Sequence, residues 1–136
     1  MYSKILVPIH LGEAGKAKLM LDAARQLADA GAAIVLVNVV EEVPAYVAAE
    51  LPRGLMESSR EEAVRRLEEL AGREGIAATV DVRIGHPAST ILAAAEEHGS
   101  DVIIIASHRP GFQDYLIGST AGRVVRHARC SVLVIR

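Results

Sequence analysis

Apolar residues along this chain are grouped in short blocks that predict five strands with helices between them. Four blocks are almost wholly apolar, as expected for strands that are buried on both faces of a parallel sheet. These predicted strands cover residues 4–9, 33–40, 101–106 and Ser131–Ile135, and Asn38 is the single polar interruption of the second. In the remaining predicted strand, residues 79–84, the apolar Val80, Val82 and Ile84 alternate with polar residues. This alternation indicates that one face of the strand is exposed to solvent, which is typical of an edge strand.

Apolar residues at helical spacing predict four helices between the strands. They cover residues 13–30, a segment that opens at Ser58 or Ser59 and is ended by Gly72 and Gly75, a segment from Pro87 to Gly99, and residues 118–129. Gly31 suits the C-cap of the first helix, and Ser58 and Ser59 each begin a capping box with a Glu three residues later. Pro87 suits a first helical position. The charged residues of the second helix are interpreted as a solvated face, namely Arg65, Arg66, Glu68 and Glu69. Residues 41–56 are irregular, with room for one helical turn.

Strands that alternate with helices predict an α/β fold with an open five-stranded parallel sheet and helices on both faces. The strand order 3-2-1-4-5 puts the alternating strand at an edge, as its pattern requires. This order also creates a topological switch point between strands 1 and 4, where ligands bind outside the carboxyl ends of the strands. The loops that meet there contain Pro8, Ile9 and His10 on one side and residues 107–118 on the other. The 136 residues suit one domain, 1–136.

Composition narrows the classes of function. The chain has one Phe, three Tyr and no Trp, so its core is expected to be aliphatic. A net charge of −2 provides no basic field that would attract nucleic acid. Cys130 is the single cysteine, which excludes an internal disulfide and fits a reducing compartment. We see neither a signal peptide nor an apolar run of transmembrane length. We therefore expect a soluble cytoplasmic protein with no nucleic-acid or membrane partner.

Gly118, Ser119 and Thr120 stand where the loop after the fourth strand turns into the last helix. A helix start offers unpaired N–H groups and the positive end of the helix dipole, which suit an anion such as phosphate. The two hydroxyl groups can add donors. The alternative is an ordinary helix cap, which Ser and Thr make routinely. The location at the switch point favours phosphate.

Other candidate residues lie in the same loops. Arg109 can pair with phosphate oxygens through its planar fork, or it is simply a surface arginine. His108 and His10 either face the crevice or serve packing and the surface, and they lack the carboxylate or thiolate partners that would predict a metal site. No Ser-His-Asp or Cys-His grouping and no Walker-type phosphate loop is readable, so no catalytic residue is assigned.

Three segments resemble the universal stress protein family. They are Ile5-Leu6-Val7-Pro8, Val102-Ile103-Ile104-Ile105-Ala106-Ser107-His108 followed by Gly118-Ser119, and Val124-Val125-Arg126-His127-Ala128-Arg129-Cys130-Ser131-Val132-Leu133-Val134. In addition, Ser107-His108-Arg109-Pro110 with Tyr115-Leu116 is similar to the small F and G subgroup of bacterial members. The resemblance covers the whole chain. It implies a Rossmann-like fold, dimers and, in many members, ATP at the switch point.

The nucleotide motif of that family is Gly, two residues, Gly, nine residues, then Gly-Ser or Gly-Thr. Here Ala106 and Arg109 replace the first two glycines, eight residues separate Arg109 from Gly118, and Gly118-Ser119 is intact. His10 stands where the family has an Asp near the ribose and phosphates. Val39 matches a position whose backbone contacts adenine, although it is also expected in the core. The resemblance and the crevice together assign nucleotide binding to Pro8, Ile9, His10, Val39, Ala106, Ser107, His108, Arg109, Gly111, Gly118, Ser119 and Thr120.

The resemblance implies a stress-response regulatory protein that binds ATP or another adenine nucleotide, with or without Mg²⁺. A homodimer through Ser131–Ile135 would cover an apolar edge that otherwise invites aggregation. Two alternatives stay open. A slow ATP phosphohydrolase would need a base beside the γ-phosphate, and His10 is not acidic, which favours binding over catalysis. A nucleotide-free interaction module is motivated by Ala106 and Arg109 in place of glycines.

Overall fold

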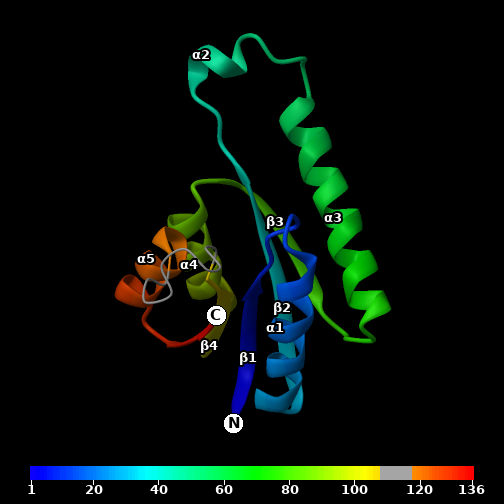
Figure 1. Cartoon of the computed structure of the whole chain (residues 1–136), viewed down its shortest axis with the longest axis vertical. Coiled ribbons are helices and arrows are strands. Elements are labelled where there is room, and N and C mark those ends of the chain that lie inside the picture. Colours follow the sequence, from blue (N-terminus) through cyan, green and yellow to red (C-terminus); the bar gives the residue numbers. More distant parts are fainter. Residues whose placement is uncertain (108–117) are drawn as a thin grey trace.

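Five parallel strands form one sheet in the order β3-β2-β1-β4-β5, which confirms the predicted α/β fold and strand order (Figure 1). The computed structural model describes residues 1–107 and 118–136. The strands are β1 (Tyr2–Pro8), β2 (Ala28–Glu41), β3 (Thr79–Gly85), β4 (Val102–Ala106) and β5 (Ser131–Ile135). The helices are α1 (Ala14–Leu27), α2 (Ala45–Ala48), α3 (Leu55–Arg73), α4 (Pro87–His98) and α5 (Ser119–His127).

Two aliphatic cores lie on the two faces of the sheet. Successive side chains of a strand point to opposite faces. On the central strand β1, Ile5 and Val7 therefore pack with α1 and α3, whereas Leu6 packs with α4 and α5. All three side chains are almost completely buried. Helices thus cover both faces, as predicted.

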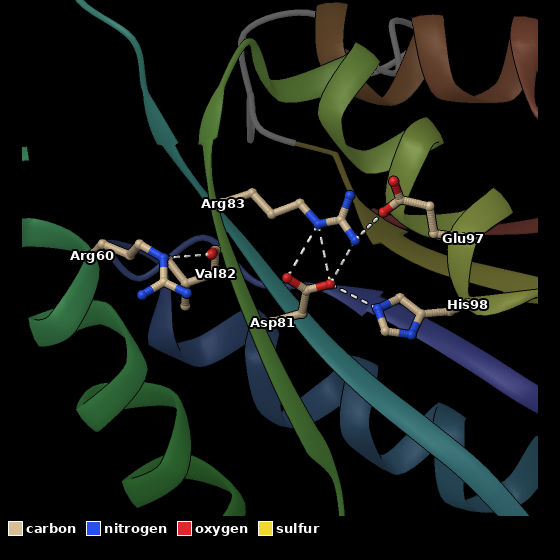
Figure 2. A network of polar contacts seen from close by, with 6 residues as sticks. All are labelled: Arg60, Asp81, Val82, Arg83, Glu97 and His98. Carbon is tan, nitrogen blue, oxygen red and sulfur yellow. Dashed lines mark hydrogen bonds and ion pairs between the residues drawn. The ribbon is translucent and has the colours of Figure 1, made fainter. Parts of the chain in front are cut away.

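The edge position of β3 was predicted correctly, but its expected wet face is wrong. Val82 is buried, whereas Ile84 on the same side of the strand is 39% exposed. On the other side, the side chains of Asp81 and Arg83 are only 19% and 24% exposed. The reason is that Glu97 and His98, at the end of α4, lie over this side and pair with the two β3 residues (Figure 2).

The predicted end of the first helix is also wrong. α1 ends at Leu27, and β2 begins at Ala28, which pairs with Tyr2 of β1. Gly31 has φ +77° but lies inside β2, beside a shift in register against β1 between Tyr2 and Lys4. Hydrogen bonding to the neighbouring strand thus prevails over the helix propensity of this alanine-rich segment.

The second long helix begins earlier than either capping box predicted. α3 starts at Leu55, and its N-cap is Gly54 in the left-handed conformation, with φ +78°. Ser58 lies one turn inside the helix, where its N–H donates to the Gly54 carbonyl at 2.8 Å. The helical turn allowed within residues 41–56 is α2, and both α2 and the start of α3 project beyond the sheet (Figure 1). Within residues 1–107 and 118–136, no helix combines the length and apolar character needed to cross a membrane.

The remaining helix ends follow the local signals in the sequence more closely. Pro87 is the first residue of α4, and Gly99 ends this helix with φ +64°. α5 runs from Ser119 to His127, which is shorter at both ends than the predicted 118–129. β5 has the predicted bounds, but the expected burial on both faces is wrong for the single chain, because β5 is an edge strand and none of its residues is buried.

Candidate functional site

A cavity of about 840 Å³ opens at the carboxyl ends of the strands, around the switch point between β1 and β4. Its lining combines residues from the loop after β1, the ends of β2 and β4, the first two turns of α1 and α4, residues 58–66 of α3, and the first turn of α5. Of the residues assigned from the sequence, the following line it: Pro8, Ile9, His10, Val39, Ala106 and Thr120. The fold therefore brings these separated segments to one place.

Other assigned residues lie beside the cavity or cannot be placed. Ser107, Gly118 and Ser119 are not among the described residues that line it. Ser107 is buried and extends β4, with its N–H donating to the Ile135 carbonyl at 2.9 Å. Ser119 is the exposed first residue of α5. His108, Arg109 and Gly111 lie outside the described residues.

The start of α5 has an unusual backbone conformation. Gly118 is the N-cap and has φ +86° and ψ 157°. These angles fall in a region that is open essentially to glycine alone. Because Gly118 occupies the N-cap position, Ser119 and Thr120 lie inside the first turn and not at the cap position that was the alternative. Because the first N–H groups of a helix have no partner within it, this terminus is suited to accept an anion.

The loop between β1 and α1 folds tightly around His10. The Gly12 N–H donates to Nδ1 of His10 at 3.3 Å, and the Glu13 N–H donates to the His10 carbonyl at 3.0 Å. A Cβ on Gly12 would come within 3.0 Å of Cε1 of His10, so a larger residue would displace the ring. Glu13 lines the cavity as well. In the described ranges, no group of three or more His, Cys, Asp or Glu residues could hold a metal ion.

Three polar side chains that line the cavity form hydrogen bonds to the backbone of neighbouring segments, and none of the three was assigned from the sequence. Asn38 donates from Nδ2 to the Ile9 carbonyl at 2.8 Å. Lys16 donates to the Ser107 carbonyl, and Arg66 donates to the Leu11 carbonyl at 3.0 Å. Asn38 had a signal, since it is the one polar residue in a buried strand. Lys16 and Arg66 had none, because a charged residue on a helix usually faces solvent.

The lining divides into an apolar part and a charged part. The apolar part includes Val37, Val39, Ile91, Ile105 and Ala106. The charged part comes from α3 and from the segments around it, and it consists of Glu13, Lys16, Glu41, Glu62, Arg65 and Arg66. Arg65 and Arg66 are exposed, as the interpretation of a solvated face expected, and they also border the cavity. Arg65 pairs with Glu62. An apolar wall with a few polar groups is typical of a small-molecule site.

A second polar network lies between β3 and α4 (Figure 2). Arg83 donates to Asp81 from Nε at 3.1 Å and from Nη2 at 2.9 Å, and Nη2 is also 2.5 Å from Glu97. Nε2 of His98 is 2.7 Å from Oδ2 of Asp81, the oxygen that also accepts from Nη2 of Arg83. Burial raises the pKa of Asp81, but the hydrogen bonds from Arg83 and His98 outweigh burial and hold this pKa below its ordinary value. The network ties the edge strand to the end of α4.

The fold and the cavity define a Rossmann-like α/β protein with a ligand site at the switch point of its sheet. A sequence model of the Universal stress protein family matches residues 1–136. The chain belongs to the universal stress protein family, which confirms the resemblance seen in its motifs.

Curated relatives and solved structures agree with this assignment. Universal stress protein A homolog 2 of Coxiella burnetii is 34% identical over 140 residues, which cover 99% of this chain and 95% of that protein. Universal stress protein G of Salmonella typhimurium is 30% identical over 142 residues and is matched over the full length of both chains, 100% of each. Among solved structures, hypothetical protein MJ0577 has a TM-score of 0.81 at 26% identity, with 99% of this chain and 96% of that chain covered.

Two more distant structures share the fold and were solved with nucleotides. A universal stress protein in complex with cAMP has a TM-score of 0.66 at 18% identity, covering 99% of this chain and 97% of that chain. The universal stress protein from Archaeoglobus fulgidus in complex with dAMP has a TM-score of 0.61 at 19% identity, covering 99% of this chain and 98% of that chain.

Proposed function

We propose that this protein binds an adenine nucleotide, ATP in particular, in the cavity at the carboxyl ends of its strands. The observation that carries the proposal is the meeting of an apolar wall with the start of α5 in one cavity of about 840 Å³. The structural relatives solved with cAMP and dAMP support adenine as the base. Nucleotide binding would regulate the response to stress, and the protein itself would perform little or no chemistry.

The proposed binding mode follows the division of the cavity lining. The adenine ring would lie against Val39 and Ile91 and meet the backbone at the end of β2. The phosphates would point toward Gly118 and Thr120 at the start of α5, where the N–H groups and the helix dipole favour negative charge. Since the described residues offer no three-ligand metal cluster, Mg²⁺ would enter with the nucleotide and be held mainly by phosphate oxygens.

Native mass spectrometry of freshly purified protein, followed by calorimetric titration with ATP, ADP and AMP, tests this proposal. We expect a bound adenine nucleotide or a saturable titration with a stoichiometry of one per chain. If no nucleotide co-purifies and none binds at millimolar concentration, the proposal is wrong and the alternative holds, namely that the protein is a nucleotide-free interaction module. The replacement of a family glycine by Ala106 would then explain the loss of binding.

Slow ATP hydrolysis is a second candidate function. It is favoured by one observation, namely that the carboxylate-bearing Glu13 lines the cavity next to His10. A carboxylate is the group that could position a water molecule beside a γ-phosphate. A phosphate-release assay on the parent and on Glu13→Gln separates the two functions: release that Glu13→Gln abolishes indicates an enzyme, whereas no release indicates a binding protein.

We also propose that the protein acts as a homodimer through β5. β5 has β4 as its partner strand in the sheet, and Leu133 on β5 is 37% exposed. An open apolar edge of this kind is usually paired or protected. The opposite edge is partly protected, because Nε of Arg60 on α3 donates to the Val82 carbonyl of β3 at 3.1 Å (Figure 2). This difference between the two edges supports β5 as the dimer contact.

The remaining expectations are part of the same proposal. Residues 1–136 would act as one domain. The single cysteine supports a location in the reducing cytoplasm.

A further inference from the structure

Lys16 occupies a particular place in the cavity. It lies in the first turn of α1, its side chain is half-buried, and it lines the cavity near the switch point. Its ammonium group donates to the carbonyl of Ser107, the residue that directly follows β4. Lys16 therefore stands where the chain leaves β4 on its way to the start of α5.

The charge of Lys16 has no counter-ion among the described residues. Of the other cations in the lining, Arg65 pairs with Glu62, and Arg66 donates to the Leu11 carbonyl. In residues 1–107 and 118–136, no carboxylate lies within ion-pair distance of Lys16, and its hydrogen-bond acceptor, the Ser107 carbonyl, is neutral. An ammonium group has three donors, of which this carbonyl takes one. Withdrawing such a charge from water is costly unless an anion compensates it.

We propose that Lys16 binds the phosphate groups of the ligand, together with the N-terminus of α5. The inference rests on the proposed nucleotide function and names the residue that would compensate the phosphate charge. A helix N-terminus supplies only about half an elementary charge, whereas a triphosphate carries several negative charges. The full charge of Lys16 would therefore favour nucleoside di- and triphosphates. Its bond to Ser107 holds the ammonium group at the carboxyl end of β4 before the ligand arrives.

Substitution of Lys16 by Gln tests the proposal, since Gln keeps a donor for the Ser107 carbonyl but removes the charge. ATP, adenosine and inorganic tripolyphosphate are titrated calorimetrically into the parent and the variant. We expect Lys16→Gln to weaken ATP and tripolyphosphate binding roughly tenfold to hundredfold, as for the loss of one charge-assisted hydrogen bond. Adenosine, which has no phosphate, should bind both proteins equally, and Lys16→Arg should retain most of the affinity for ATP.

Lys18→Gln is the matched control. Lys18 is two residues further along α1, is 63% exposed, and pairs with Asp22. It does not line the cavity among the described residues, so ATP should bind this variant as it binds the parent. Circular dichroism verifies that each variant folds, and Lys16→Met replaces Lys16→Gln if the latter does not.

The outcomes separate this inference from the function on which it rests. If the parent binds ATP and Lys16→Gln binds it equally well, Lys16 is not a phosphate ligand and the nucleotide function stands. If Lys16→Gln weakens adenosine as much as ATP, Lys16 only shapes the cavity through Ser107, and the inference is also wrong. If the parent binds tripolyphosphate but neither nucleotide nor adenosine, and Lys16→Gln loses that binding, the inference holds without the nucleotide function. A parent that binds none of the three ligands refutes both.

Discussion

The substitution Gly118→Val is expected to abolish nucleotide binding. Gly118 has φ +86° and ψ 157° at the N-cap of α5. A residue with a Cβ in this region costs on the order of 1–3 kcal/mol, and a β-branched valine is at the upper end of that range. The chain can avoid the strain only by turning the N-cap into another conformation, which would redirect the first N–H groups of α5.

The expected loss of affinity follows from those N–H groups. Each charge-assisted hydrogen bond to a phosphate contributes roughly 1.5–3 kcal/mol, so losing two of them weakens binding by a factor of more than about a hundred. Gly118→Val should therefore show no measurable ATP binding, and Gly118→Ala should show weaker binding than the parent. Arg109→Ala, at a residue outside the described ranges, should lose one such bond and bind roughly tenfold to hundredfold more weakly.

Calorimetric titration of ATP into each variant measures the effect, and thermal unfolding verifies that the variant folds. Gly72→Ala is the matched glycine control, because Gly72 lies inside α3 without a positive φ and a Cβ there meets no atom within 4 Å. It should leave ATP binding unchanged and stabilise the protein by roughly 0.5–1 kcal/mol. If Gly118→Val binds ATP as the parent does, the phosphates do not lie at the start of α5 and the site assignment is wrong.

Three further predictions concern other parts of the molecule. Asp81→Asn should destabilise the protein by roughly 1–3 kcal/mol in urea unfolding at pH 7, because Arg83 loses a charged partner. The folded-state pKa of Asp81 lies below its ordinary value of 3.8. The stability difference between parent and variant should therefore be fully present above pH 3.8 and shrink as the pH falls below it. A stability difference that stays constant down to acid pH would contradict a role for the Asp81 carboxylate in this network. Leu133→Lys should shift a dimer toward monomer in light scattering, because a charged edge disfavours strand pairing, and an unchanged mass would move the dimer contact elsewhere. Burial raises the pKa of the Cys130 thiol, so it should react with a thiol reagent far more slowly in the folded protein than in urea, and equal rates would show an accessible thiolate.

The sequence by itself determined the order of the elements and the strand order. Four apolar blocks and one alternating block were enough, because strands that alternate with helices leave few possible topologies. The burial of each strand followed less closely, since α4 covers the polar side of β3 and no residue of β5 is buried in the single chain. Local signals also identified the ends of α4, where Pro87 and Gly99 act through their own backbone preferences. The switch point followed from the topology, and several assigned residues of the β1 and β4 ends do line the cavity there.

Local signals failed where a distant partner competed with them. The alanines after Leu27 favour a helix, yet Ala28 pairs with Tyr2 and already belongs to β2. Ser58 and Ser59 offer capping boxes, yet a left-handed Gly54 starts α3 earlier. In both places the neighbouring structure supplies hydrogen bonds or a turn whose free energy exceeds the small difference in propensity.

Tertiary structure alone decided which charged residues matter. Lys16, Arg66 and Asp81 carry no local mark that separates them from solvated surface residues. Their partners are the carbonyl of Ser107, the carbonyl of Leu11 and the side chains of Arg83 and His98. Arg83 lies on the same strand as Asp81, but the other partners lie in segments distant along the chain. These contacts therefore exist only once the sheet has brought the segments together. A residue pattern records how deeply a position is buried, but the identity of a polar partner depends on the path of the whole chain.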